Sequence, residues 1–337
     1  MKLFLIGFLG AGFGLAQLPS VAVRITPPNA AGRATNQVGT AILGFTAGPA
    51  PLQLNAILGV FGAARISQPV AVPETVTRLY LSARQHYALV EQNSAGPLAI
   101  WNLDETVLLD HKVSGDGLVA IAGALPHPDL VAFSPRGESV ALYASASRQL
   151  QVVAGMPNKA FIKKTPPLES PATITMIAVS DDANVVVTKD SVGDLQVSTG
   201  DTNWRPVYGA YSPLAWSFIP NSHDLIISDS QENAVFLIEQ ADSKNARVVL
   251  AENCVPDQLA VTSDGEILAA LDSKRSILWT TDLKSLGSNV TTSAQNLNSL
   301  TMLRNGNTFI ASSRTAGPTL LKISNSAAVE AAALGAR

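Results

Sequence analysis

A short pattern of residues recurs six times along this chain and constrains its fold more than any other feature of the sequence. Each copy has an apolar run, a tight turn, a second apolar run, a polar turn and a third apolar run. The copies begin at Leu79, Leu130, Met176, Trp216, Leu259 and Leu300. Their first turns end at residues 85, 137, 183, 222, 265 and 306, which are 52, 46, 39, 43 and 41 residues apart. A sheet of four short strands with its turns needs about 40 to 50 residues, so each copy has the length of one such sheet.

The apolar runs have the character of buried strands. They are short, rich in Val, Ile and Leu, and bounded by Gly, Pro, Asp, Asn and Ser. The turns Ser134–Gly137 and Ser263–Gly265 place Pro or Asp early and Gly where φ must become positive. One such sheet cannot bury both of its faces alone, so the sheets must stack around a common axis. The repeat therefore predicts an all-β propeller.

Two segments resemble the first strands of known bacterial propellers. They are Ala132–Gly137, with the sequence AFSPRG, and Pro256–Gly265, with the sequence PDQLAVTSDG. The resemblance is to the YVTN, NHL and WD-repeat-like families and covers residues 76 to about 323. It implies the propeller architecture and no particular activity. The Gly-His and Trp-Asp dipeptides of true WD repeats are missing.

The six copies predict six four-stranded blades. The last copy has three strands before an Ala-rich tail, residues 326–337, so we expect an N-terminal strand to complete it and close the ring. Residues 39–75 contain apolar runs that can form this closing strand. The alternative is that these runs form several strands of a degenerate seventh blade. The predicted organisation is a signal peptide at 1–16, an extended leader at 17–38, ring-closing strands at 39–75 and propeller repeats at 76–325.

The N-terminus predicts export to the periplasm or the medium. Lys2 is followed by an uncharged run, residues 3–16, that ends in the small-residue site Gly14-Leu15-Ala16. This run is shorter than the roughly 18 residues of a membrane span, so no transmembrane segment is expected in the mature chain. Without Lys2 the chain has 22 basic and 26 acidic residues, from 23 and 26 in the full sequence. A nucleic-acid-binding surface requires an excess of basic residues, which this balance does not provide.

Three aspartates, Asp190, Asp229 and Asp272, are the candidate ligand-binding residues. Each is followed by Ser and stands where the second strand of its copy ends. One hypothesis is that each carboxylate bonds nearby backbone amides and holds a turn. The other is that the three form a partial acidic arc at the channel mouth that holds a cation or a basic group.

No catalytic residue, metal site or cofactor is predicted. The four histidines, at 86, 111, 127 and 223, lack metal-ligand spacing, and no Gly-x-Ser-x-Gly motif is present. The favoured function is an exported scaffold that binds a protein or a small molecule of unknown identity. The alternative is a hydrolase or lactonase with a metal at the channel mouth. A quinone-dependent oxidoreductase is disfavoured because the first strands lack the basic and aromatic residues that such a cofactor needs.

Overall fold

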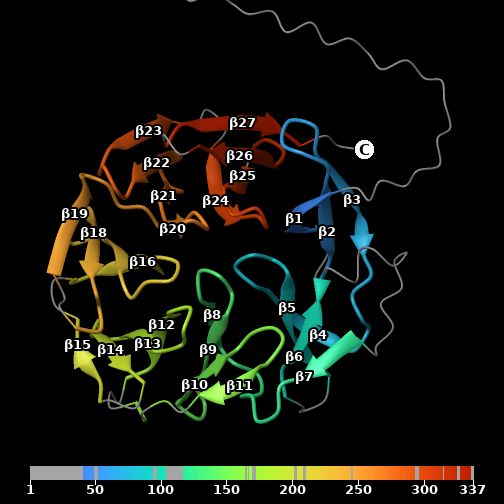
Figure 1. Ribbon diagram of the computed structural model, residues 1–337, viewed down its shortest axis with the longest axis vertical. Coiled ribbons are helices and arrows are strands. Elements are labelled where there is room, and N and C mark those ends of the chain that lie inside the picture. The colour runs from blue at the N-terminus through green and yellow to red at the C-terminus, as the bar shows by residue number, and fades with distance from the viewer. Residues whose placement is uncertain are drawn as a thin grey trace, which may run out of the picture. The chain divides into compact units, whose positions relative to one another are not determined.

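The computed structural model describes residues 41–48, 52–93, 97–103, 117–163, 165, 167–168, 172–200, 203–207, 210–243, 246–292, 296–313, 315–324 and 327–334. These residues belong to one compact unit, Gly39–Arg337, in which antiparallel sheets follow one another around a ring (Figure 1). The predicted signal peptide and leader lie outside the described residues. In the described part of the chain, no helix is long and apolar enough to cross a membrane.

The described strands form seven sheets, the blades of a propeller, in which the first strand is innermost. Blade 1 contains β1 (Ile42–Ala47), β2 (Leu54–Leu58) and β3 (Arg65–Val70). Blade 2 contains β4 (Val76–Leu81), β5 (Tyr87–Gln92), β6 (Ala99–Asn102) and β7 (Leu118–Ala120). Blade 3 contains β8 (Leu130–Phe133), β9 (Ser139–Ala144), β10 (Gln149–Ala154) and β11 (Phe161–Lys163). Blade 4 contains β12 (Ile174–Val179), β13 (Val185–Asp190), β14 (Leu195–Thr199) and β15 (Arg205–Pro206). Blade 5 contains β16 (Pro213–Phe218), β17 (Leu225–Asp229), β18 (Ala234–Glu239) and β19 (Ala246–Glu252). Blade 6 contains β20 (Gln258–Val261), β21 (Ile267–Asp272), β22 (Ile277–Asp282) and β23 (Ser288–Thr292). Blade 7 contains β24 (Leu297–Met302), β25 (Thr308–Ser313), β26 (Thr319–Ile323) and β27 (Val329–Ala333).

The number of blades and the closure of the ring correct the main prediction from sequence. The expected count of six is wrong, and the alternative of seven blades is confirmed. The tail supplies β27, which pairs with β26 from Val329 opposite Ile323 to Ala333 opposite Thr319. The last blade is therefore complete without an N-terminal strand, and the predicted closure by strand addition is wrong.

Blade 1 has three strands within the described residues, and its outer strand β3 carries features of a protected sheet edge. Pro69 has no N–H to offer a further strand, and the pairing with β2 shifts register between Asn55 and Ile57. Blade 1 closes the ring by packing against blade 7, where Ile57, Leu303 and Leu320 are buried together.

The hydrophobic core is divided among the contacts between neighbouring blades. The described residues form seven buried clusters, one for each pair of adjacent blades around the ring. Trp101 lies in the cluster between blades 1 and 2, Tyr143 between blades 3 and 4, and Phe236 between blades 4 and 5. Each blade thus buries one face on the preceding blade and one on the next, as the repeat requires.

The turns between first and second strands share a residue in the left-handed region of φ. A residue with positive φ occurs in the turn of every recognised copy: Gln85, Gly137, Ala183, Asn221, Gly265 and Gly306. Five of these six are the turn-ending residues of the sequence pattern. A buried hydroxyl at the start of four of the turns accepts a hydrogen bond from the first amide of the second strand: Ser82 from Tyr87, Ser134 from Ser139, Ser180 from Val185 and Thr262 from Ile267.

Candidate functional site

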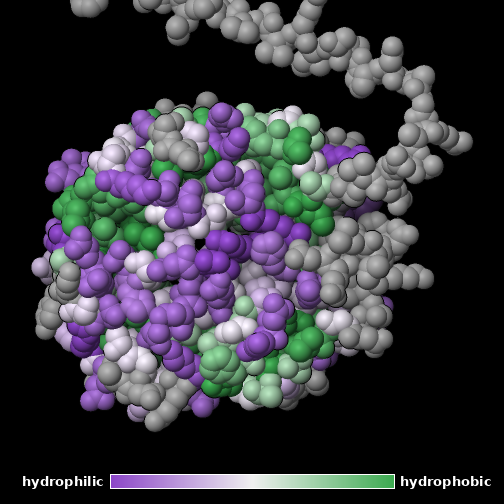
Figure 2. Space-filling model, in the orientation of Figure 1, coloured by the Kyte–Doolittle hydropathy of each residue, from purple (hydrophilic) through white to green (hydrophobic). Residues whose placement is uncertain are grey.

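The turns between first and second strands meet at the axis on one side of the ring, here called the turn face. Arg84 of blade 2 donates from Nη2 to the carbonyl of Ser263 in blade 6, at 3.2 Å. Arg304 of blade 7 donates from Nε to the carbonyl of Gln85 in blade 2, at 3.1 Å. Such bonds between blades that are not neighbours require the turns to converge, as Figure 1 shows. On the face in view, hydrophilic residues gather around a small central opening (Figure 2).

Three further turns, one each from blades 3, 4 and 5, complete this polar rim through contacts with one another. Arg136 donates from Nη1 to Oδ1 of Asn221, at 2.8 Å. The buried carboxylate of Asp181 accepts the backbone amides of Arg136 and Asn221, at 2.7 and 2.9 Å. We call Arg84, Gln85, Arg136, Asp181, Asn221, Ser263 and Arg304 the turn ring. Hydrogen bonds join these residues in two groups at the turn-face end of the propeller axis, one across blades 2, 6 and 7 and one across blades 3, 4 and 5.

A channel cavity of about 560 Å³ runs along the axis, lined by the first strands of blades 2 to 7. Its wall includes Leu81, Phe133, Met176, Trp216 and Leu259. The apolar character expected for the innermost strands is thus present in the channel wall.

Most polar side chains of the channel wall are hydrogen-bonded within the protein. Gln258 accepts the amide of Leu300 at 2.8 Å and donates to the carbonyl of Asn298 at 2.9 Å. Trp216 donates from Nε1 to the carbonyl of Ile177, at 3.3 Å. Gln85 differs, because its Oε1 accepts the amide of Phe45 while its buried Nε2 has no acceptor among the described residues. The channel therefore offers a ligand apolar surface and one spare donor at its turn-face end.

The three candidate aspartates lie at the ends of β13, β17 and β21, on the face opposite the turn face. All three are buried. Oδ1 of Asp190 accepts the amides of residues 192, 193 and 194, and Oδ1 of Asp272 accepts those of residues 274 and 275. Asp229 uses both oxygens: Oδ1 accepts the amides of residues 231 and 232, and Oδ2 those of residues 211 and 212.

These bonds are the turn-holding contacts of the first hypothesis, and the ligand-binding role of the three aspartates stays a prediction. Across the described ranges, no group of three or more His, Cys, Asp or Glu side chains is placed to hold a metal ion. The single Cys254 is buried, and burial raises the pKa of its thiol to about 11.

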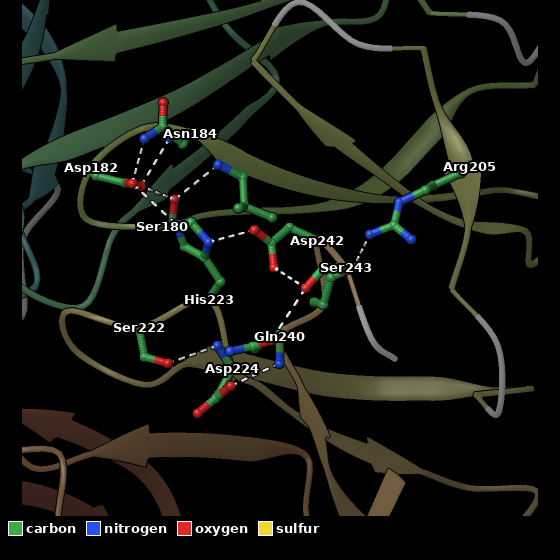
Figure 3. A network of polar contacts seen from close by, with 12 residues as sticks. Ser180, Asp182, Asn184, Arg205, Ser222, His223, Asp224, Gln240, Asp242 and Ser243 are labelled. Carbon is green, nitrogen blue, oxygen red and sulfur yellow. Dashed lines mark hydrogen bonds and ion pairs between the residues drawn. The ribbon is translucent and has the colours of Figure 1, made fainter. Parts of the chain in front are cut away.

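A polar network on the turn face joins blades 4 and 5 through His223 (Figure 3). Nδ1 of His223 lies 2.7 Å from Oδ2 of Asp242, and Nε2 lies 3.0 Å from Oδ2 of Asp182. Ser180 donates to Oδ1 of Asp182 at 2.6 Å, so its hydroxyl is directed at a carboxylate and not at the imidazole. A nucleophilic triad needs the hydroxyl on the imidazole, so this network is a clamp between blades and not a catalytic triad.

Both ring nitrogens of His223 face carboxylates, which favours the protonated imidazolium. Burial alone would lower the pKa of His223, but the hydrogen bonds and charges of Asp182 and Asp242 outweigh it and raise this pKa. Burial alone would raise the pKa of Asp182, but hydrogen bonds from Ser180, the amide of Asn184 and His223 hold it well below its usual range.

The raised pKa of His223 predicts how stability depends on pH. Its stabilising contribution is full below the unfolded-state pKa, about 6.5, and is lost as pH rises through the higher folded-state value. The contribution of Asp182 is present above its unfolded-state pKa and is lost only in strong acid. Because the imidazole is partly exposed, we expect wild type to lose about 0.5–1 kcal/mol more than His223→Gln between about pH 6 and pH 9. Urea unfolding at both pH values measures this, and equal losses in the two proteins would contradict it.

The other histidines take separate places. Nδ1 of His127 lies 2.8 Å from Oε2 of Glu91. The carboxylate of Glu91 is buried and also accepts a hydrogen bond from the Tyr80 hydroxyl, at 2.7 Å. His86 is exposed on the turn face, and His111 lies outside the described residues.

The turn-ring arginines were not identified from the sequence as candidate site residues, although Arg84 and Arg136 each stand directly before the residue that ends a repeated turn. That repeated position was the signal that could have identified them.

Comparison with known proteins shows the fold alone. No known protein family matches this sequence, and no curated protein matches it. The chain is similar in structure to PorZ, an essential bacterial surface component of the type-IX secretion system of Porphyromonas gingivalis. That likeness has a TM-score of 0.55 and 12% identity over 88% of this chain, which spans 38% of the PorZ chain. It is also similar to the Cps50 (Swd1) β-propeller domain of Myceliophteria thermophila, with a TM-score of 0.50 and 10% identity over 75% of this chain and 84% of that one.

The architecture and these similarities place the chain in the class of β-propellers. In general terms, a propeller is a rigid binding scaffold, whose ring presents a channel and two faces of turns. The narrower resemblance to the YVTN, NHL and WD-repeat-like families stays a prediction.

Proposed function

We propose that this chain is an exported binding scaffold whose central channel holds a small, mostly apolar molecule. The observation that carries the proposal is the cavity of about 560 Å³ lined by six first strands. Its volume falls within the range of roughly 300–1,000 Å³ that is usual for small-molecule sites. Export rests on the N-terminal pattern of Lys2, the uncharged run and Gly14-Leu15-Ala16.

The chemistry of the wall supports an uncharged ligand. Leu81, Phe133 and Leu259 supply apolar contact area, while Gln258 and Trp216 are already hydrogen-bonded within the protein. An anionic ligand would lose its hydration here without gaining a counter-ion, because the charged side chain in the lining, Asp257, is a carboxylate. That carboxylate already accepts the amide and the hydroxyl of Ser273. A single acceptor on the ligand, placed near Gln85, would match the spare Nε2 donor.

The test measures binding of a neutral fluorescent dye, N-phenyl-1-naphthylamine, to the mature protein recovered after export, whose first residue we expect to be Gln17. We expect saturable one-to-one binding with quenching of tryptophan emission, because Trp216 lies in the channel wall. Leu214→Arg should weaken binding at least tenfold, because Leu214 lines the channel and a charge there must be desolvated on dye binding.

Val192→Arg is the matched control for that substitution. Val192 is 74% exposed and Leu214 is 41% exposed, and Val192 does not line the channel. The control variant should therefore bind the dye as wild type does. Equal weakening by both substitutions, or no saturable binding to wild type, would refute a channel ligand. An intact Met1 in the exported protein would refute cleavage at the expected site.

A further inference from the structure

A second pocket, separate from the channel, lies on the turn face between blades 2 and 3. Its volume is about 230 Å³, and its lining includes Arg84, His86, Tyr87, Arg136, Glu138 and Met156. Two guanidinium groups from neighbouring turns thus border one small space. We call it the arginine pocket.

The guanidinium groups of the two arginines are held in place from outside the pocket. Arg84 is anchored through Nη2 to the carbonyl of Ser263, and Arg136 through Nη1 to Asn221. The Nε of Arg84 is buried and has no acceptor among the described residues. The guanidinium of Arg84 is therefore dehydrated at Nε without a bonded anion there. This dehydration costs free energy, which a bound anion would offset.

The two positive charges also act on one another. Burial, followed by the like charge of Arg136, lowers the pKa of Arg84 below its ordinary value. The partner that Arg136 already has shows which anion fits this place: Oε1 of Glu138 lies 3.0 Å from its Nε. Arginine forks match carboxylates in geometry as well as in charge.

We propose that the arginine pocket binds a carboxylate carried on a short aliphatic chain, with Arg84 as its main partner. The buried side chains of Tyr87 and Met156 supply an apolar wall for the methylene groups beside the carboxylate. Glu138 competes for Arg136 from within the pocket, so binding displaces or shares that contact. The carboxylate belongs either to a free organic acid or to an acidic side chain of a protein, and both have the same chemistry here.

The experiment titrates three probes into the full chain by calorimetry: glutarate, a blocked tripeptide with a central glutamate, and inorganic phosphate. At least one carboxylate probe should bind wild type with saturation and more tightly than phosphate. Arg84→Gln should weaken that binding at least tenfold, because one charge-assisted bond is lost. Glu138→Gln should strengthen it severalfold, because it frees Arg136; the side chain is 48% exposed, so the fold tolerates the change.

Arg275→Gln is the matched control, because Arg275 is 57% exposed and does not line the pocket. Binding of glutarate alone assigns the site to a free acid, and preference for the peptide assigns it to a protein side chain. The proposal is overturned if no carboxylate binds, if phosphate binds as tightly, or if Glu138→Gln leaves the affinity unchanged. Dye binding in the channel is read separately in each variant, so failure of the channel proposal is distinguishable from failure of this one.

Discussion

Asp229→Asn is expected to lower the free energy of unfolding by about 2–4 kcal/mol, a large effect for a change of one atom. Asp229 is fully buried, and its two carboxylate oxygens together accept four backbone amides. Asparagine has one oxygen, and its NH₂ group would face two N–H donors. Two amides would then lose their acceptor, and because these bonds are partly buried each loss costs about 1–2 kcal/mol. Urea unfolding followed by circular dichroism measures the difference.

Asp272→Asn is the control, because Asp272 is also buried and stands at the same position of the neighbouring blade. Its Oδ1 accepts both amides, and its Oδ2 faces the exposed guanidinium of Arg275 at 3.6 Å. The asparagine carbonyl can keep both amide bonds, so the expected loss is below about 1 kcal/mol. Equal losses in the two variants would show that the number of accepted amides does not govern stability here. If melts with added calcium showed stabilisation that Asp272→Asn abolished, the cation hypothesis would replace the structural one.

Removal of residues 327–337 is expected to destabilise the propeller by about 3–5 kcal/mol. The deletion takes away β27, whose five residues pair with β26. It also removes the apolar contacts of Val329 and Leu334 with the clusters on either side of blade 7. Both side chains are partly buried, so each is worth about 1 kcal/mol, below the value for full burial. The carbonyl of Ala327, which accepts the Thr280 hydroxyl at 2.6 Å, is lost as well.

Truncation after Leu334 is the matched control, because it keeps β27 and removes only residues 335–337. Thermal melts of the two truncated proteins should differ clearly, and the longer deletion should aggregate more readily because β26 becomes an exposed sheet edge. Equal melting temperatures would mean that β27 contributes little and that the ring tolerates an incomplete last blade.

The sequence by itself determined the propeller architecture and the first three strands of its six recognised blades. The reason is that their turns are specified locally. The hydroxyl of Ser134 bonds an amide five residues later, and Gly137 adopts the positive φ that ends the turn. Such contacts involve residues close in the chain, so they appear as a repeated phrase in the sequence. The position of the candidate aspartates at strand ends followed from the same repeat.

Tertiary structure alone decided the number of blades, the closure of the ring and the sites at the axis. The sequence of β27, VEAAA, has little β-propensity of its own, and it becomes a strand because the edge of β26 offers it partners. The four amides that meet Asp229 come from two separate turns, which the repeat pattern does not relate. Arg84 bonds Ser263 across 179 residues, a contact that exists only when seven blades bring their turns to one axis. Contacts of that range depend on how the blades close, and no local pattern encodes them.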